Sequence, residues 1–188
     1  MLFTYLLSAF FLLFAAYMIF RIFVRRDYLQ HKQLSFASTT LESLIWLPFF
    51  LFPYIYNPRS WPAFWVLEAD LPVFLIYAGA ILIILGLIMG LTAMAWLGFR
   101  RAFGRQVDRL VQTGFYSLSR NPQVVGFTPL ILGIALRWSS WYAAGWLLLY
   151  AAMIHMMVLT EEEHLKDVFG EEYVQYCSHV PRYIVLWK

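Results

Sequence analysis

The stretch LPVFLIYAGAILIILGLIMGLTAMAWL, residues 71–97, contains no charged side chain in 27 consecutive positions. A helix needs roughly 20 apolar residues to cross the hydrocarbon core of a bilayer, so this stretch is long enough to span it. Within it, Gly86 and Gly90 have the four-residue spacing that lets a second helix pack closely. The stretch therefore predicts a membrane-spanning helix with a small-residue contact face. Room for a lipid tail is the alternative reading of the glycines.

The rest of the chain is also strongly apolar. Of its 188 residues, 62% are hydrophobic and only 13% are charged, which is more apolar surface than a soluble domain of this size buries. Four further apolar runs are Leu2–Val24, Thr39–Tyr56, Pro122–Leu136 and Ser140–Leu159. The run from Thr39 should be kinked by Pro48 and Pro53, and the run from Pro122 is short, at roughly 22 Å of helix. We expect an all-α, polytopic membrane protein with about five transmembrane helices, a C-terminal helical hairpin and a cytosolic C-terminal segment.

The distribution of cations predicts the orientation. With five crossings, twelve of the fourteen Lys and Arg residues fall on one side of the membrane. Cytosolic loops carry such an excess, so we expect the N-terminus outside and the C-terminus in the cytosol, in a cell membrane or an endomembrane. The net charge of +3 then reflects topology and contact with anionic membrane lipids, and no nucleic-acid partner is expected.

Neither a disulfide framework nor a second domain is indicated. The single cysteine, Cys177, excludes an intrachain disulfide and a thiolate-rich metal site, and we expect no metal. No linker divides the chain, so residues 1–188 are predicted to form one domain. Within it, residues 1–97 carry the first three spans and residues 98–188 form the half that would bind a cofactor.

A polar segment, Arg120-Asn121-Pro122-Gln123-Val124-Val125-Gly126, stands where a basic loop becomes an apolar helix. Asn121 suits the N-cap, and Pro122 suits the first helical position because its missing N–H would have no partner there. The free N–H groups of the first turn, together with Arg120, predict a site for an anion such as a carboxylate. The alternative is a capped transmembrane helix with an arginine at its cytosolic end.

An acidic run, Glu161-Glu162-Glu163-His164-Leu165, lies where the last span leaves the membrane. It stands on a basic face at the C-terminal end of a helix, where the dipole disfavours anions, so we expect cations to compensate it. A solvated acidic turn is the alternative. The last two spans are joined by a short connection at 137–141 and should be antiparallel neighbours, which brings the acidic run opposite Asn121. Such a pair of sites matches a zwitterion, for example the methionine part of S-adenosylmethionine.

Several segments together resemble the isoprenylcysteine carboxyl methyltransferase family and its phospholipid methyltransferase relatives. They are Leu110–Tyr116 (LVQTGFY), Arg120-Asn121-Pro122 with Gly126, Glu161-Glu162-Glu163 with Leu165, Phe169–Tyr173 (FGEEY) with Tyr176, and Val180-Pro181-Arg182. The resemblance starts at about Gly98. It implies a methyl donor held between the last two spans and the C-terminal segment, without a Rossmann domain. The chain departs from the family pattern in having Asn121 for a histidine and Val124 for a tyrosine.

The resemblance and the spacing of the motifs give the candidate site. We expect catalytic roles for Arg120, Glu162 and Arg182. We expect binding of the cofactor S-adenosyl-L-methionine by Gly114, Tyr116, Arg120, Asn121, Pro122, Gln123, Gly126, His155, Glu161, Glu162 and Tyr173. His155 is included because it lies seven residues before Glu162 on the same helix face, and a satisfied core histidine is its alternative reading.

These residues predict a membrane-embedded S-adenosylmethionine-dependent methyltransferase. Its substrate would be a lipid or a lipid-modified molecule such as an isoprenylcysteine carboxylate, reacting at the cytosolic face. A carboxylate acceptor needs no general base, whereas an amine must first lose a proton, for which Glu161 or Glu162 could serve. The alternatives are a phospholipid amine N-methyltransferase, a sterol-reductase-like enzyme that uses NADPH, and a non-enzymatic membrane subunit.

Overall fold

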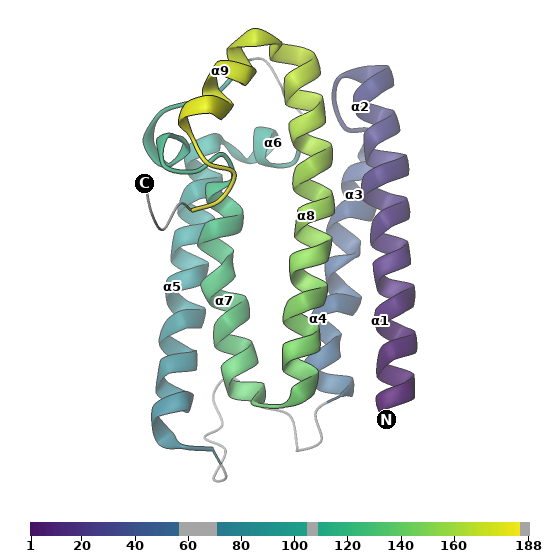
Figure 1. The fold of residues 1–188 in the computed structure, drawn as a ribbon, viewed down its shortest axis with the longest axis vertical. Coiled ribbons are helices and arrows are strands. Elements are labelled where there is room, and N and C mark those ends of the chain that lie inside the picture. The colour runs from purple at the N-terminus through teal and green to yellow at the C-terminus, as the bar shows by residue number, and fades with distance from the viewer. Residues whose placement is uncertain (57–70, 105–108, 185–188) are drawn as a thin grey trace.

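A computed structural model describes residues 1–56, 71–104 and 109–184, and every regular element in these ranges is helical. The elements are α1 Leu2–Tyr17, a π-helical stretch η1 Met18–Val24, α2 Arg25–His31, α3 Phe36–Leu44, α4 Trp46–Ile55, α5 Val73–Leu97, α6 Phe99–Ala102, a 3₁₀ turn η2 Gly114–Ser117, α7 Pro122–Trp138, α8 Trp141–Phe169 and α9 Glu171–His179. The long helices stand side by side as a bundle, and α2, α6 and α9 gather at one end of it (Figure 1). The predicted all-α polytopic fold is confirmed.

Four helices of the described chain are long and apolar enough to cross a membrane. They are Leu2–His31, Phe36–Ile55, Val73–Leu97 and Trp141–Phe169. The second is interrupted at a single residue, Ile45, because α3 ends at Leu44 and α4 begins at Trp46. Pro48 has no N–H to donate to the carbonyl four residues earlier, so the helix breaks within that turn.

The remaining predicted span, α7, has 17 residues, or roughly 26 Å of helix at 1.5 Å per residue. It is shorter than the four apolar helices but runs alongside α5 for most of its length (Figure 1). The predicted hairpin is also present, because α7 ends at Trp138 and α8 begins at Trp141. The chain thus contains the predicted C-terminal pair of antiparallel helices.

Glycines allow α5 and α7 to pack against each other at backbone distance. A Cβ atom on Gly86 would lie 2.3 Å from the backbone nitrogen of Leu130, and one on Gly126 would lie 2.7 Å from the nitrogen of Gly90. Only glycine can occupy positions where two backbones approach this closely. The predicted small-residue contact is therefore confirmed, and α7 fills the space that a lipid tail would need.

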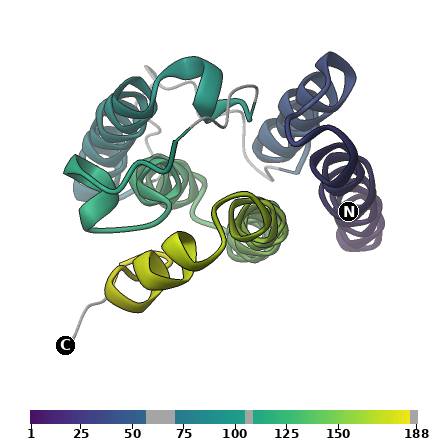
Figure 2. The same ribbon diagram turned by 90° about the horizontal axis from the view of Figure 1, so that it is seen from above.

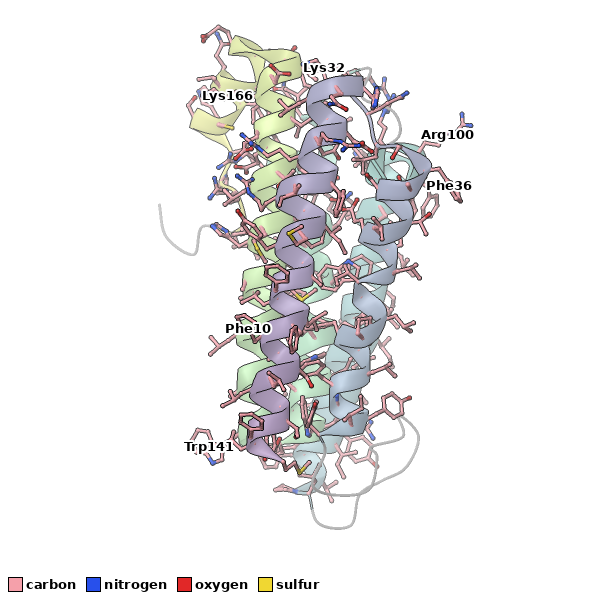
Figure 3. The ribbon with its side chains drawn as sticks, turned by 90° about the vertical axis from the view of Figure 1, so that its right-hand side faces the viewer. Phe10, Lys32, Phe36, Arg100, Trp141 and Lys166 are labelled. Atoms are coloured by element: carbon pink, nitrogen blue, oxygen red, sulfur yellow. The ribbon has the colours of Figure 1, made fainter. Side chains whose placement is uncertain are left out.

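Aromatic residues form the core between α4 and α8. The ring of Trp146 stacks on that of Phe49, with centroids 4.6 Å apart, and its indole N–H donates a hydrogen bond to the Phe49 carbonyl. Both side chains are fully buried. By contrast, Phe10 on α1 points away from the bundle (Figure 3), as a lipid-facing side chain does.

Charged residues join the N-terminal helices to α8. Arg21 and Arg25 contact the Glu163 carboxylate at 2.7 and 2.8 Å, and Lys32 is paired with Asp167. Figure 3 shows Lys32 at the same end of the bundle as Lys166 and Arg100, and Trp141 at the opposite end. The polar groups of the protein are thus concentrated where α2, α6 and α9 meet. The candidate site lies there.

Candidate functional site at the charged end of the bundle

Asn121 occupies the predicted N-cap position of α7, with Pro122 first in the helix, but its side chain does not cap the helix. Its amide nitrogen donates instead to the carbonyl of Arg182, at 3.0 Å, while its backbone N–H donates to the Ser119 hydroxyl. The prediction of a side-chain cap is therefore wrong. The amide is drawn to the C-terminal chain, which passes over the start of α7.

Three hydrogen bonds between described residues hold this C-terminal segment, residues 180–184, to the start of α7. Besides the bond from Asn121, the backbone N–H of Arg120 donates to the Pro181 carbonyl at 2.9 Å. The Ser119 hydroxyl donates to the Arg182 carbonyl at 3.3 Å. The segments around Asn121 and Glu162, predicted to meet, both contact Arg182 in the chain that follows α9. Figure 2 shows α9 leading away from the end of α8.

Glu162 lies between two arginines. Its carboxylate is 3.0 Å from Nη1 of Arg120, and it accepts hydrogen bonds from Nε and Nη2 of Arg182 at 3.0 and 2.7 Å. Its side chain is only 11% exposed, and these hydrogen bonds raise the pKa of Arg182. With Glu163 held by Arg21 and Arg25, the predicted cationic compensation is present for two members of the acidic run, Glu162 and Glu163. Arg120, predicted as the anion-binding group, already has a carboxylate partner.

A polar cavity of about 110 Å³ opens beside this ion-pair cluster of Arg120, Glu162 and Arg182. Five of the predicted site residues line it, namely Tyr116, Arg120, Asn121, Gln123 and Glu161. The wall is completed by residues that sequence reasoning did not select, including Tyr28, Arg101, Arg109, His164 and Tyr176. The cavity therefore draws on both halves of the chain.

Buried polar atoms at the cavity wall are left without hydrogen-bond partners in the described chain. They are the Tyr116 hydroxyl, Nε of Arg120 and both ring nitrogens of His164. Burial and the nearby Glu161 carboxylate raise the pKa of Tyr116, so its hydroxyl keeps its proton and can donate. Unpartnered buried groups are costly, and a polar ligand would satisfy them. Glu161 and Arg120 thus both stand at the cavity wall.

The other predicted residues lie outside this cavity. Gly114 faces the ring of Trp96, Gly126 packs against α5, and Pro122 only begins α7. Tyr173 is buried in a cluster with Tyr176 and Val180 behind the cavity, next to the ion-pair cluster. Glu162 and Arg182 are paired with each other in the ion-pair cluster.

His155 lines a different space, an apolar groove between α7 and α8. This groove has a volume of about 490 Å³. Its walls include Val124, Ile131, Leu147, Tyr150 and Ile154. At one end Nδ1 of His155 lies 3.5 Å from the Tyr183 hydroxyl. A further cavity of about 660 Å³ shares Leu132 and Leu147 with it and continues to Trp141, so apolar space follows α8 to the other end of the bundle.

Fold and site together define an integral membrane protein with a polar cavity at one end and an apolar groove along its helices. Residues 74–172 match the phospholipid methyltransferase family. This region covers more than half of the chain, which therefore belongs to that family. The match runs from α5 into α9 and so begins earlier than the resemblance noted at Gly98. Comparison with curated proteins and with solved structures yields no match.

Two cavity residues missed by sequence reasoning contact each other. The Tyr28 ring stacks on the imidazole of His164, with centroids 3.9 Å apart and planes 5° from parallel. Tyr28 lies before residue 74, in the part of the chain that neither the resemblance nor the family match covers, so no motif selected it. His164 lies within the acidic run, and the negative charge of its neighbours indicated a charged site without pointing to the histidine itself.

Proposed function

We propose that the chain is an S-adenosylmethionine-dependent methyltransferase that acts on a lipid or lipid-modified substrate at the cytosolic membrane surface. The observation that carries the proposal is the polar cavity, whose wall brings Arg120, Asn121 and Gln123 from one motif together with Glu161 from another. The family relationship supports methyl transfer. The proposal adds the identity of the donor and the side of the membrane.

The residues at the cavity have the charges that the donor's amino acid part requires. Glu161 would accept from its ammonium group, since it stands at the cavity wall, whereas Glu162 is already paired with Arg120 and Arg182. The unpartnered Nε of Arg120 and the Tyr116 hydroxyl would donate to its carboxylate. When bound, the donor supplies an activated methyl group on a positively charged sulfur. The protein's task is then to align the nucleophile and exclude water.

The groove between α7 and α8 supports a lipid acceptor. Apolar side chains line it, and its Tyr183 end adjoins Arg182 of the ion-pair cluster. A hydrocarbon chain in this groove would place its head group near that cluster, and Arg120 of the same cluster also lines the polar cavity. The cluster would thus stand between donor and acceptor. This arrangement suits both an isoprenylcysteine-like carboxylate and a phospholipid amine.

The cytosolic orientation is part of the same proposal. The described cations near the site, among them Arg25, Lys32, Arg101 and Arg120, stand at the end where α2, α6 and α9 meet (Figures 1 and 3). A cytosolic face carries such an excess of Lys and Arg. A water-soluble donor would then reach the cavity directly.

Ligand-dependent thermal stability of the purified protein in detergent tests the proposal. S-adenosylhomocysteine at 100 times its dissociation constant should stabilise the folded state by about 2.7 kcal/mol. NADPH at equal concentration is the control, and stabilisation by NADPH alone would favour a sterol-reductase-like enzyme. No shift with either ligand would favour a non-enzymatic membrane subunit and contradict the proposal.

A further inference from the structure

The groove between α7 and α8 has a polar end whose side chains the proposed function leaves without a role. Four of the residues that line the groove carry polar side-chain atoms, namely Thr128, Tyr150, His155 and Tyr183. They stand toward the charged end of the bundle, whereas Leu147 lines the groove farther from it. Polar side chains at membrane depth are costly and mark functional sites. The polar end of the groove therefore calls for a ligand.

The polar groups at this end contact one another only loosely. Nδ1 of His155 lies 3.5 Å from the Tyr183 hydroxyl, and the hydroxyls of Tyr150 and Thr128 are 3.4 Å apart. Strong hydrogen bonds between such groups are shorter, at about 2.7 to 3.0 Å. The Thr128 hydroxyl already donates to the Val124 carbonyl of its own helix at 2.8 Å. His155 and Tyr183 are thus the pair that a ligand oxygen could engage.

His155 and Tyr183 together can donate hydrogen bonds into the groove. Burial raises the pKa of Tyr183, so its hydroxyl keeps its proton. A neutral imidazole carries one N–H, on either of its ring nitrogens. The pair therefore has two donors whichever nitrogen holds the proton, and the contact between the two side chains uses at most one of them. Because the His155 side chain is exposed at the wall of the groove, the other donor can reach a ligand.

Positive charge stands next to this pair. Tyr183 directly follows Arg182 in the chain, and Arg182 shares the Glu162 carboxylate with Arg120. Two guanidinium groups and one carboxylate leave the ion-pair cluster with one positive charge in excess. Besides burial, Arg182 and Glu162 are the largest influences on the pKa of Tyr183, so its hydroxyl lies within their electrostatic reach. The charge of the cluster would thus favour an anionic oxygen at this end of the groove.

We propose that His155 and Tyr183 bind an anionic oxygen in the head group of the acceptor and thereby hold its hydrocarbon chain in the groove. This inference rests on the proposed function and deepens it by assigning the residues that position the acceptor. The oxygen can belong to a phosphate or to a carboxylate, since both are charged acceptors of O–H and N–H donors. His155 would then serve the acceptor and not the donor, for which sequence reasoning selected it.

The donor and the acceptor would accordingly depend on different side chains. His155 and Tyr183 line the groove, whereas Tyr116 and Gln123 line the polar cavity. Changes to the first pair should therefore weaken the binding of an anionic amphiphile and leave the binding of S-adenosylhomocysteine intact. A purely structural pair would behave differently, because its loss would affect any occupant of the groove, whatever the head group.

The test uses three single-chain probes with different head groups, namely hexadecyl phosphate, palmitate and hexadecyltrimethylammonium. Each carries a photoactivatable diazirine near the far end of its chain. Cross-linking to the protein in a non-ionic maltoside detergent, followed by mass spectrometry, gives the half-saturating concentration of each probe. We expect the anionic probes to label Leu132 or Leu147, deep in the groove. The preference of wild type between phosphate and carboxylate then identifies the source of the oxygen.

Two substitutions remove the proposed donors, His155→Leu and Tyr183→Phe. Each should raise the half-saturating concentration of the preferred anionic probe about 10-fold, as expected for the loss of one hydrogen bond to a charged group. Labelling by the trimethylammonium probe should not change. The matched controls are His31→Leu and Tyr77→Phe, which alter exposed side chains on α2 and α5 and should leave all three probes unaffected.

Affinity for S-adenosylhomocysteine within threefold of wild type shows that a variant is folded. If His155→Leu does not fold, Tyr183→Phe, which removes a single oxygen atom, carries the test. Anionic-probe binding within threefold of wild type in Tyr183→Phe would overturn the inference, as would equal weakening of the trimethylammonium probe or a wild-type groove that no anionic probe labels. Failure of wild type to bind S-adenosylhomocysteine would instead overturn the proposed function, since the probe measurements need no donor.

Discussion

Replacing Glu162 by Gln should destabilise the protein more than the same change one residue later. The substitution keeps the size of the side chain but removes its charge, so Arg120 and Arg182 lose their common carboxylate partner. Arg120 is 14% exposed and Arg182 is 35% exposed. Removing one partner of a buried ion pair costs about 3 to 5 kcal/mol. Because water screens the more exposed Arg182, we take the lower end, about 3 kcal/mol.

Glu163→Gln is the matched control. Glu163 also pairs with two arginines, Arg21 and Arg25, but its side chain is 43% exposed. An exposed ion pair contributes about 0 to 1 kcal/mol, so this change should be mild. At about 2 to 4 °C per kcal/mol for a chain of this size, Glu162→Gln should lower Tm by roughly 6 to 12 °C. Glu163→Gln removes two exposed pairs and should lower Tm by less, at most about 8 °C.

Thermal unfolding followed by tryptophan fluorescence in detergent, without ligand, measures the two shifts. Burial of the carboxylate is the only large difference between the sites, since both residues lie on α8 and both contact two guanidinium groups. Equal Tm values for the two variants would show that burial does not strengthen the Glu162 cluster. The ion pairs of Glu162 would then add little to the stability of the folded protein, and Arg120 and Arg182 would be available to bind a ligand.

Three further predictions concern the donor site, the orientation and the helix packing. Glu161→Gln should weaken S-adenosylhomocysteine binding about 30- to 150-fold, from the loss of about 2 to 3 kcal/mol, and unchanged affinity by calorimetry would remove this residue from the donor site. A cysteine replacing Ser140 should react with an impermeant thiol reagent added outside intact cells, whereas labelling of native Cys177 would contradict the cytosolic orientation. Gly86→Ala should lower Tm because its Cβ would lie 2.3 Å from a backbone nitrogen of α7, whereas the nearest atom to the Cβ of Gly145→Ala is the Tyr5 hydroxyl at 2.7 Å, which belongs to a side chain and not to the backbone; equal Tm values for the two variants would contradict the packing argument.

Sequence reasoning predicted the features that depend on local composition. Apolar length identified the spans, and Pro48 identified the break between α3 and α4. The paired glycines on α5 indicated its close contact face, although the sequence could not say which helix would fill it. The hairpin between α7 and α8 brought the two polar motifs together, because a short connection leaves little choice of topology.

The partners of individual polar groups could not be predicted. Asn121 has the right identity for a cap, yet its amide bonds to a carbonyl 61 residues later. Arg120 was predicted to face a ligand, and its contact with Glu162 depends on how α8 and the C-terminal segment are placed. Tyr28 reaches the cavity only because α2 folds onto α8. Such contacts are set by tertiary structure and leave no periodic signal in the sequence.

The ion pairs between the N-terminal helices and α8 also bear on how the protein is made. A chain is synthesised from its N-terminus, so Arg21, Arg25 and Lys32 reach the membrane surface long before the carboxylates of α8 exist. Until then these cations lack their partners on α8 and can contact water and anionic lipid head groups. Arrival of α8 exchanges those temporary partners for Glu163 and Asp167 and lays His164 against a Tyr28 already in position. The cavity wall is therefore completed late in biogenesis, when α8 packs against the α2 helix that was synthesised first.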